Sequence, residues 1–311
     1  MSGFLVTGGA GFIGSHLADA LLGAGHLVRV LDDFSTGRRA NLDPRCEVVV
    51  GDVADLATVR AAMAGLDGCF HLAAIASVVR GNEDWLGTHR ANQTGTIAVL
   101  QAARDVGRVP VVYASSAAVY GDLDGRVARE TLPPVPLTAY GADKFGSELH
   151  ARVGWQVHRV PTLGLRFFNV YGPRQDPASP YSGVVSIFAA RIASGLPLAI
   201  HGEGTQTRDF VYVADAVAHL IAAMATLPRA GGSGVLNVCT GRGTSVLELA
   251  QTLARLHDRP LRLQHGPARL GDIERSVGDP ADAIACLGLR AATPLAAGLA
   301  ATLAALQPAA A

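Results

Sequence analysis

Tyr140 and Lys144 are residues of the types that transfer protons. They lie four residues apart in Tyr140-Gly-Ala-Asp-Lys144, which places a phenol and an ammonium group on one face of a predicted helix. A phenol with a pKa of about 10 is a poor base at neutral pH, but a lysine cation beside it favours the phenolate. The spacing alone is more typical of a surface pair. Ser116 ends a predicted strand about two dozen residues upstream and could pass a proton between a substrate hydroxyl and the phenolate, so we predict these three residues as catalytic.

A glycine-rich turn follows the first predicted strand, Phe4–Thr7. Gly8 allows a tight turn, Gly11 lets the backbone approach a pyrophosphate, and Gly14 lets a helix pack closely. The N–H groups and the dipole at the start of that helix attract phosphates. Such a turn alone is weak evidence. Asp32, at the end of the second predicted strand, lies about twenty residues further on, and the combination predicts a dinucleotide site.

The carboxylates after the second and third strands suggest which dinucleotide is bound. Asp32 would accept hydrogen bonds from both hydroxyls of the adenosine ribose and repel a 2′-phosphate, which favours NAD over NADP. Arg38 and Arg39 lie just downstream and leave NADP as the alternative. Asp52 fits a contact with the adenine edge, with an ordinary turn carboxylate as its alternative. The nicotinamide cation of bound NAD would favour the Tyr140 phenolate further.

Short apolar runs alternate with amphipathic segments through the first half of the chain. The predicted strands are Phe4–Thr7, Leu27–Leu31, Glu47–Val50, Gly68–Leu72 and Val109–Ala114, and helical patterns cover 15–23, 56–64, 84–106 and 139–153. Continuous apolar strands between helices predict an α/β fold with a doubly wound parallel sheet, the Rossmann fold. Beyond Arg166 the alternation becomes irregular. We predict a cofactor-binding domain over 1–168, with 209–240 contributing, and a smaller α/β substrate-binding lobe over 169–311 that ends in a helix within 291–311.

Composition excludes several classes of partner. The 311 residues include 26 basic and 26 acidic side chains, so the net charge of zero gives no reason to expect nucleic acid or an anionic membrane. The four cysteines lie far apart and match neither a CxxC pair nor a zinc spacing, so we expect reduced thiols and no metal. There is no long uncharged apolar run and no secretory leader pattern, and we expect a cytoplasmic protein.

The motifs TGGAGFIGSH, HLAA, SSAAVYG, YGADK, RFFNVYGPRQ and RDFVYVAD resemble those of the extended short-chain dehydrogenases/reductases that act on nucleotide sugars. The resemblance covers essentially the whole chain. It is closest to the UDP-hexose 4-epimerases, particularly bacterial ones that accept N-acetylated sugars. It implies NAD as cofactor, a UDP-sugar as substrate, and a homodimer through a four-helix interface. The patterns over 84–106 and 139–153 carry enough apolar positions for that interface.

The resemblance also implies roles for single positions. Those expected to bind the cofactor are Gly8, Gly11, Phe12, Ile13, Gly14, Asp32, Asp33, Asp52, Val53, Leu72, Ala73, Ala74, Asn92, Ser115, Tyr140, Lys144 and Phe167. Those expected to bind the substrate are Ser77, Ser116, Tyr140, Asn169, Gln175, Val184, Arg208, Arg269, Asp272 and Ser276. Arg208 and Arg269 would clamp the diphosphate with their planar guanidinium groups, and Asp272 would bind the uridine ribose. For Ser77 and Gln175, a solvated loop position fits equally well.

Two alanines after Ser116 separate the reactions of this family. Dehydratases carry an acid–base pair there, and decarboxylases acting on UDP-glucuronate carry a glutamate nearby, whereas Ala117 and Ala118 cannot transfer a proton. The sequence therefore favours 4-epimerisation through a transient 4-keto sugar. A UDP-glucuronate 4-epimerase is the alternative enzyme, with Arg174 as the only obvious cation for the extra carboxylate. An NAD-binding sensor or scaffold is the alternative without catalysis.

Ser276 bears on the choice of sugar. It lies four residues after Asp272, where epimerases that shut out N-acetyl groups carry a large aromatic residue. A serine leaves room for an acetamido group, so UDP-GlcNAc and UDP-GalNAc should be accepted. UDP-glucose and UDP-galactose should be accepted too, because a roomy pocket does not reject a smaller sugar. Ala76 stands where some glucose-type epimerases carry lysine, which weakens the likeness to those members.

Overall fold

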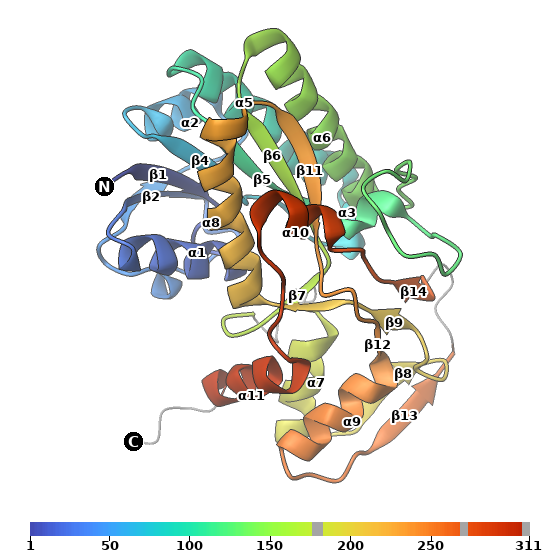
Figure 1. The fold of residues 1–311 in the computed structure, drawn as a ribbon. Helices are drawn as coiled ribbons and strands as arrows, with labels where there is room; N and C mark the ends of the chain where they lie inside the picture. The colour runs from blue at the N-terminus through green and yellow to red at the C-terminus, as the bar shows by residue number, and fades with distance from the viewer. Residues whose placement is uncertain (176–182, 268–272, 307–311) are drawn as a thin grey trace.

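The computed structural model describes residues 1–175, 183–267 and 273–306 of the protein (Figure 1). Its centre is a seven-stranded sheet in the order β11-β6-β5-β4-β1-β2-β3, in which every neighbouring pair is parallel. The strands are β1 (Gly3–Thr7), β2 (Leu27–Asp32), β3 (Glu47–Val50), β4 (Gly68–His71), β5 (Val111–Ser116), β6 (Thr162–Phe167) and β11 (Ser233–Val238). The predicted doubly wound sheet is confirmed.

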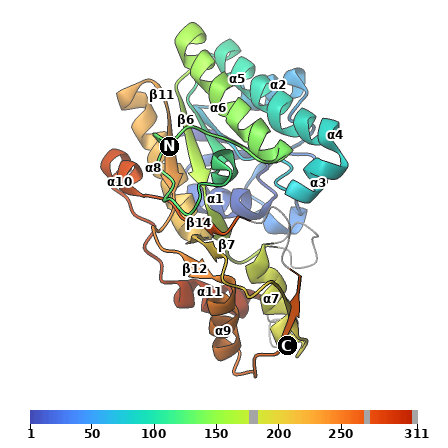
Figure 2. The ribbon, with the colours of Figure 1, turned by 90° about the vertical axis from the view of Figure 1, so that its right-hand side faces the viewer.

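Helices cover both faces of this sheet (Figures 1 and 2). One face carries α1 (Phe12–Gly23) and α8 (Val213–Ala230), and the other carries α2 (Leu56–Met63), α5 (Gly95–Asp105) and α6 (Ala139–His158). Successive strand residues point to opposite faces, so Val6 joins the core beneath α1 and α8 while Leu5 joins the core beneath α2 and α5. Burial on both sides explains why the strands are continuously apolar.

Several boundaries differ from the predicted ones. Helix α1 begins at Phe12 rather than Ser15, because Gly11 is already its N-cap. Strand β5 begins at Val111 rather than Val109, since Pro110 has no N–H for the ladder. The pattern over 84–106 is divided into α4 (Trp85–His89), a π-helical segment at Arg90–Thr94, and α5. Helix α6 is one turn longer than expected, because apolar and polar positions continue to His158.

The smaller lobe follows β6 and has a core of its own around Phe188, Leu198 and Leu249. Its strands are β7 (Asn169–Tyr171), β8 (Leu198–His201), β9 (Thr207–Arg208), β10 (Phe210–Tyr212), β12 (Thr244–Ser245), β13 (Leu263–Gly266) and β14 (Arg275–Ser276). Its helices are α7 (Val184–Ala193), α9 (Val246–Leu256) and α11 (Leu295–Leu306). Helix α10 (Ala281–Leu287) instead packs against β11 and α8 (Figure 1). The boundary at residue 168 stays a prediction.

Two general properties follow from the described part of the chain. None of its helices has the length and apolar character needed to cross a membrane. All four cysteines are free thiols; Cys46, Cys69 and Cys239 are buried, and Cys286 is exposed. The expectation of thiols rather than a disulfide framework is therefore confirmed.

Candidate active site

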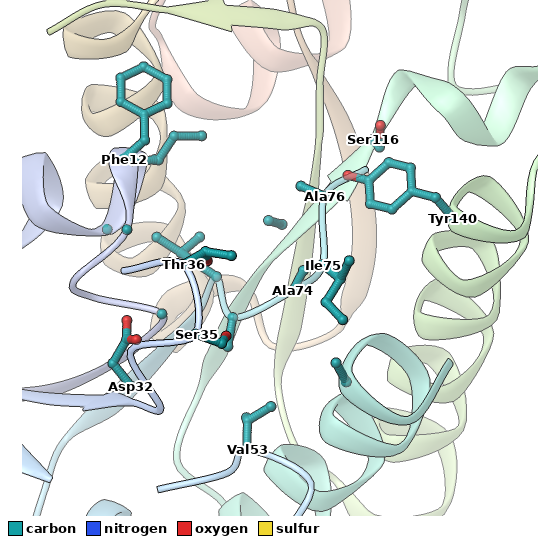
Figure 3. Close-up of a pocket in the computed structure, with 18 of the residues that line it drawn as sticks. Phe12, Asp32, Ser35, Thr36, Val53, Ala74, Ile75, Ala76, Ser116 and Tyr140 are labelled. Carbon is teal, nitrogen blue, oxygen red and sulfur yellow. The ribbon is translucent and has the colours of Figure 1, made fainter. Parts of the chain in front are cut away.

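A cavity of about 620 Å³ opens at the carboxyl ends of β1, β2, β4, β5 and β6 (Figure 3). This is where a doubly wound sheet presents the loops that bind ligands. The predicted residues that line it are Gly8, Gly11, Phe12, Ile13, Gly14, Asp32, Asp33, Asp52, Val53, Leu72, Ala73, Ala74, Ser115, Ser116, Tyr140, Lys144, Phe167, Asn169 and Gln175. The fold thus brings nearly the whole predicted cofactor set to one cavity.

Seven predicted residues are not among those that line the cavity. Arg269 and Asp272 fall outside the described residues. Asn92, Ser77, Val184, Arg208 and Ser276 are described but do not line this cavity. Ser77 is buried at the N-terminus of α3 (Val78–Glu83), where its hydroxyl accepts a hydrogen bond from the Arg80 N–H at 3.1 Å. Ser77 therefore caps α3, and its contact with the sugar stays a prediction.

The glycines of the first turn are needed for backbone geometry. Gly8 has a φ of +67°, and a Cβ there would lie 2.7 Å from the Ala73 backbone. A Cβ on Gly14 would collide with the Gly8 carbonyl oxygen. A Cβ on Gly11 would meet only that same oxygen, at 3.2 Å, so its other side is open to the cavity. The turn therefore exposes backbone N–H groups at the start of α1, as a pyrophosphate requires.

Asp32 is held by the backbone at the end of β2. Its Oδ2 accepts a hydrogen bond from the Ala10 N–H and its Oδ1 accepts one from the Phe34 N–H, both at 2.9 Å. Burial raises the pKa of Asp32, and these two hydrogen bonds oppose the rise. The remaining lone pairs face the cavity, where ribose hydroxyls would donate to them. Arg39 is one of the two arginines that left NADP as the alternative cofactor, and its guanidinium carbon lies 5.1 Å from the centre of the Phe34 ring.

Asp52, predicted to contact the adenine, already binds two protein groups. Its Oδ2 lies 2.6 Å from Arg90 Nη2, and its Oδ1 accepts from the Ala54 N–H at 2.8 Å. The Arg90 hydrogen bond is the main cause that lowers the pKa of Asp52. Its carboxylate is therefore already satisfied by protein groups, and both Asp52 and Arg90 line the cavity.

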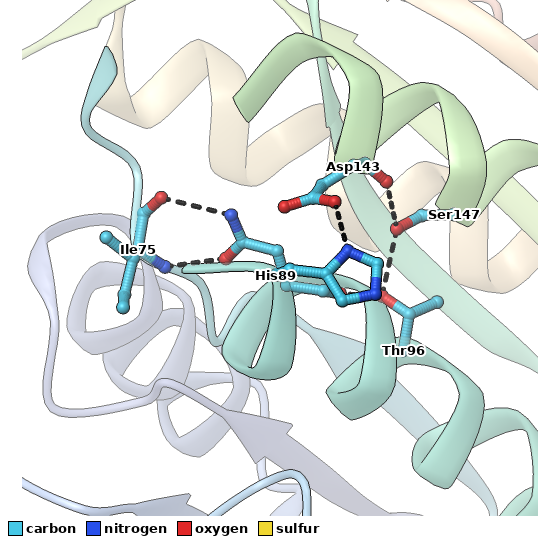
Figure 4. Close-up of polar contacts among 6 residues, drawn as sticks. Ile75, His89, Thr96, Asp143 and Ser147 are labelled. Carbon is cyan, nitrogen blue, oxygen red and sulfur yellow. Dashed lines mark hydrogen bonds and ion pairs between the residues drawn. The ribbon is translucent and has the colours of Figure 1, made fainter. Parts of the chain in front are cut away.

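Asn92 acts on the cavity through the loop after β4. Its side-chain Oδ1 accepts a hydrogen bond from the Ile75 N–H at 2.8 Å, and its Nδ2 donates to the Ile75 carbonyl oxygen at 3.2 Å (Figure 4). Ile75 and its neighbours Ala73 and Ala74 line the cavity. The amide thus fixes a cavity wall without touching the space inside.

Tyr140, Ser116 and Lys144 come together at the other end of the cavity. The Tyr140 hydroxyl points toward Ser116 (Figure 3), and the Ser116 side chain acts to lower the Tyr140 pKa. The N–H of Ala118 donates to Ser116 Oγ at 3.1 Å and orients that hydroxyl. Lys144 Nζ donates to the Ala114 carbonyl oxygen at 2.9 Å and lies 5.8 Å from the centre of the Tyr140 ring.

The electrostatics of the protein side chains define how much of the expected pKa shift Lys144 can supply. Burial raises the pKa of Tyr140, and the Ser116 side chain opposes this only in part. Burial also lowers the pKa of Lys144, to about 8. Lys144 alone therefore does not bring the Tyr140 pKa below its ordinary value, because desolvation of the phenolate outweighs the distant charge. The positive charge of a bound nicotinamide is needed in addition.

Comparison with known proteins identifies the family. Residues 4–239 match the NAD dependent epimerase/dehydratase family. The protein belongs to this family. The UDP-glucose 4-epimerase of Mycolicibacterium smegmatis is 38% identical over 310 residues, which cover 96% of each chain. The resemblance inferred from the motifs is confirmed.

Two solved structures of high similarity carry different sugars. The UDP-N-acetylglucosamine 4-epimerase from Methanobrevibacter ruminantium, in complex with UDP-N-acetylmuramic acid, has a TM-score of 0.92 at 29% identity and covers 98% of this chain and 97% of its own. MoeE5, in complex with UDP-glucuronic acid and NAD, has a TM-score of 0.87 at 35% identity and covers 97% of each chain. The family is NAD dependent, and these two proteins of similar fold were solved with different UDP-sugars.

The epimerase/dehydratase site fits NAD on its own geometry. The open side of Gly11 offers N–H groups for a pyrophosphate, and Asp32 faces the cavity with a carboxylate that suits ribose hydroxyls. Val53 and Ile75 add apolar surface to the lining of the same cavity. All of these groups lie in one continuous cavity with Tyr140 (Figure 3).

A buried ionic network beneath the catalytic residues was missed by sequence reasoning. Arg166 on β6 forms two hydrogen bonds with the Glu148 carboxylate, at 2.9 and 2.7 Å, and both side chains are buried. Ser115 Oγ donates to Glu148 Oε1 at 2.5 Å, and Arg166 Nη1 donates to the Tyr120 hydroxyl at 2.9 Å. Glu148 lies one helical turn after Lys144, a spacing that could have suggested it. The network connects α6 to the ends of β5 and β6.

Two of the substrate-binding residues predicted in the lobe stand opposite one another in a small sheet. Ser276 on β14 stands opposite Arg208 on β9 in a parallel ladder. Arg208 Nη1 donates to the Ile273 carbonyl oxygen at 2.7 Å. Gln175 lines the cavity with its Oε1 buried and without a hydrogen-bond partner among the described residues. This acceptor is available to a donor on a ligand.

Proposed function

We propose that the protein is an NAD-dependent UDP-hexose 4-epimerase that interconverts UDP-GlcNAc with UDP-GalNAc, and UDP-glucose with UDP-galactose. The observation that carries this proposal is the Tyr140 hydroxyl directed toward Ser116 at the end of a cavity that fits NAD (Figure 3). Ala117 and Ala118, directly after Ser116, offer no acid or base for dehydration. The 38% identity to a UDP-glucose 4-epimerase supports the same conclusion.

Proton transfer in this reaction belongs to Tyr140. Its phenolate removes the proton from the sugar 4-hydroxyl, directly or through Ser116, and returns it after the sugar has presented its other face. Ser116 stays oriented because the Ala118 N–H donates to its oxygen. NAD, when bound, supplies the acceptor and donor of a hydride at carbon 4. Lys144 contributes positive charge, and its hydrogen bond to Ala114 fixes where that charge lies.

The nucleotide part of the substrate supplies binding energy while the sugar turns. We propose that Arg208 and Arg269 clamp the diphosphate, that Asp272 binds the uridine ribose, and that Ser276 leaves room for an acetamido group. The pairing of β14 with β9 supports this, because it brings Ser276 and Arg208 to neighbouring positions. Asn169 and Gln175 line the cavity and are proposed sugar or diphosphate contacts.

UDP-glucuronate is the alternative substrate, because MoeE5 was solved in complex with it. The cation predicted for its carboxylate has another partner in this protein. Arg174 Nη2 lies 2.7 Å from Asp19 Oδ2 on α1, and Arg174 is exposed. A guanidinium that is already paired with a carboxylate is a poor anchor for a second one, so neutral hexoses are favoured.

We also propose a homodimer. Helices α4 and α6 expose large apolar side chains: Trp85 is 70% exposed, Leu86 80%, Leu149 48% and Val157 66%. Exposed apolar surface on two neighbouring helices is typical of an interface. Light scattering on purified protein should give twice the 32.1 kDa chain mass. Replacement of Val157 with glutamate should shift the mass toward the monomer, and a wild-type monomer would contradict the proposal.

The activity is tested with purified protein and UDP-GlcNAc, UDP-glucose and UDP-glucuronate in parallel, with the product isomers separated by chromatography. We expect the 4-epimers of the first two sugars and little reaction of the third. Conversion of UDP-glucuronate alone would replace the proposed substrate with the alternative one. If none of the three sugars yields an epimer, the protein would instead be interpreted as an NAD-binding sensor or scaffold.

A further inference from the structure

Helix α6 carries a buried carboxylate, Asp143, between Tyr140 and Lys144 in the sequence. Asp143 lies directly before Lys144 on α6 and is 5% exposed. Its Oδ1 lies 2.8 Å from Nδ1 of His89 on α4 (Figure 4). Its Oδ2 is buried and has no hydrogen-bond partner among the described residues. A buried carboxylate with one unpaired oxygen is costly, so its charge has to be compensated by another group nearby.

We propose that Asp143, held by His89, is a positioning residue that keeps the Lys144 ammonium charged in its buried site and thereby sets the alkaline limit of the enzyme. The proposal rests on the proposed function only for its effect on activity. The charge of Lys144 itself can be measured without any substrate.

Lys144 needs such support because its surroundings are otherwise unfavourable to a cation. It is 4% exposed, and burial is the main cause that lowers its pKa to about 8, while the charge of Asp143 acts in the opposite direction. The Ala114 carbonyl oxygen on β5 accepts a hydrogen bond from Nζ but carries no formal charge. On α6 itself, Tyr140 is neutral because burial raises its pKa.

His71 on β4 also faces Lys144, and it is neutral. Burial lowers the pKa of His71 to about 3, and the Lys144 charge adds to this. The Thr7 hydroxyl accepts from the Leu72 and Ala73 N–H groups, so its own hydrogen goes to His71 Nδ1 at 2.8 Å. His71 Nε2 then carries the proton and donates to Thr96 Oγ1 at 3.1 Å. Both ring nitrogens are thus committed in the neutral form.

The other elements packed on α6 supply no free negative charge. Glu148, one turn further along the helix, is paired with Arg166 of β6. Thr96 from α5 forms a hydrogen bond with the Ser147 hydroxyl, and both groups are neutral. Gly81 from α3 lies beside Ala139 and carries no charge. From α4, His89 is the titratable neighbour, and it touches Asp143. Among the described residues, Asp143 is therefore the carboxylate left to stabilise the Lys144 cation.

The composition of the chain makes Lys144 distinctive. It is the only lysine among the 26 basic side chains, and the other 25 are arginines. Arginine does not lose its proton in proteins, so Lys144 is the basic side chain whose charge can be lost at mildly alkaline pH. Lys144 is charged below its pKa and becomes neutral as the pH rises through it. The active form is therefore lost on the alkaline side.

A single lysine gives a single signal in a protein labelled with ¹³Cε-lysine. We would titrate this signal by NMR from pH 6 to 10.5, with and without added NAD, in wild type and in Asp143→Asn. The wild-type midpoint should lie near 8 in the protein without NAD. Loss of the Asp143 charge should lower it by about one pH unit. Asp43→Asn, which removes a surface carboxylate paired with Arg45, is the matched control and should leave the midpoint unchanged.

The rate profile supplies the second readout. Relative to wild type, kcat of Asp143→Asn should be within about twofold at pH 6.5 and about tenfold lower at pH 9, since one pKa unit is a factor of ten. An unchanged NMR midpoint in folded Asp143→Asn would overturn the proposal. If that variant does not fold, Asp143→Ser removes the same charge with a smaller side chain, and a midpoint equal to that of wild type in the folded Asp143→Ser protein would overturn the proposal. An absence of epimerase activity with a shifted midpoint would refute the proposed function alone.

Discussion

The two ends of the cavity are built in different ways. The cofactor end is made of backbone: the turn from Gly8 to Gly14 and the N–H groups that hold Asp32 come from short contiguous segments. The catalytic end is made of side chains from α6, β5 and β6, which Glu148 and Arg166 tie together from below. A backbone site is fixed by local geometry, whereas a side-chain site depends on pairs that are distant in the sequence. Mutations at the two ends of the cavity should therefore affect different properties of the protein.

Loss of the phenol should have the largest effect on the rate and almost none on the structure. For Tyr140→Phe we expect kcat to fall on the order of 10³-fold, because the proton acceptor is gone. NAD binding and melting temperature should stay near wild type, since among the described residues no hydrogen bond that holds the fold together depends on this hydroxyl, which points toward Ser116 (Figure 3). Steady-state kinetics and calorimetry check this. A variant as fast as wild type would remove Tyr140 from the mechanism.

Glu148→Ala should show that the catalytic end depends on its buried pair. It leaves Arg166 buried without its partner, which costs about 3–5 kcal/mol of unfolding free energy. Denaturant unfolding measures this loss. Arg129→Ala breaks the exposed pair with Asp279 and is the matched control, with an expected cost below about 1 kcal/mol. Equal costs for the two variants would contradict the distinction between buried and exposed pairs.

Gly14→Ala tests the backbone end. The added methyl group would collide with the Gly8 carbonyl oxygen, so the turn must shift, at a cost of about 1–3 kcal/mol. NAD affinity should fall by a similar free energy while Tyr140 and Lys144 keep their places. Calorimetric titration with NAD gives the affinity. Gly23→Ala, where a Cβ would meet nothing within 4 Å, should bind NAD like wild type. Unchanged affinity in Gly14→Ala would mean that this turn is not the pyrophosphate site.

Ser276→Tyr should have a smaller and selective effect. A large aromatic side chain would shut out the acetamido group, so the rate on UDP-GlcNAc should fall about 10- to 100-fold relative to UDP-glucose. The ratio of the two rates in wild type and variant measures this. Ser276→Ala, which keeps the volume small, should keep the wild-type ratio. Survival of the acetylated rate in the tyrosine variant would show that pocket volume at this position does not select the sugar.

The same contrast explains what the sequence could predict. Local signals identified the glycine turn, Asp32 and the apolar strands, because a turn, a strand end and a buried sheet each leave a pattern within a few residues. Arg166 left no such pattern and Glu148 left only its spacing of four residues from Lys144, since the pair is 18 residues apart and charged residues in a sequence are usually exposed. The burial that raises the Tyr140 pKa could not be predicted for the same reason: burial is a property of the folded protein.

The most direct test of the account follows the hydrogen at carbon 4 of the sugar. Purified protein would be given UDP-hexose deuterated at that carbon, in ordinary water, and the product 4-epimer analysed by NMR and mass spectrometry. If the hydrogen is carried as a hydride within the closed site, the label should remain at carbon 4 of the epimer. Replacement of the label by solvent hydrogen, or the absence of any epimer, would contradict the proposed function.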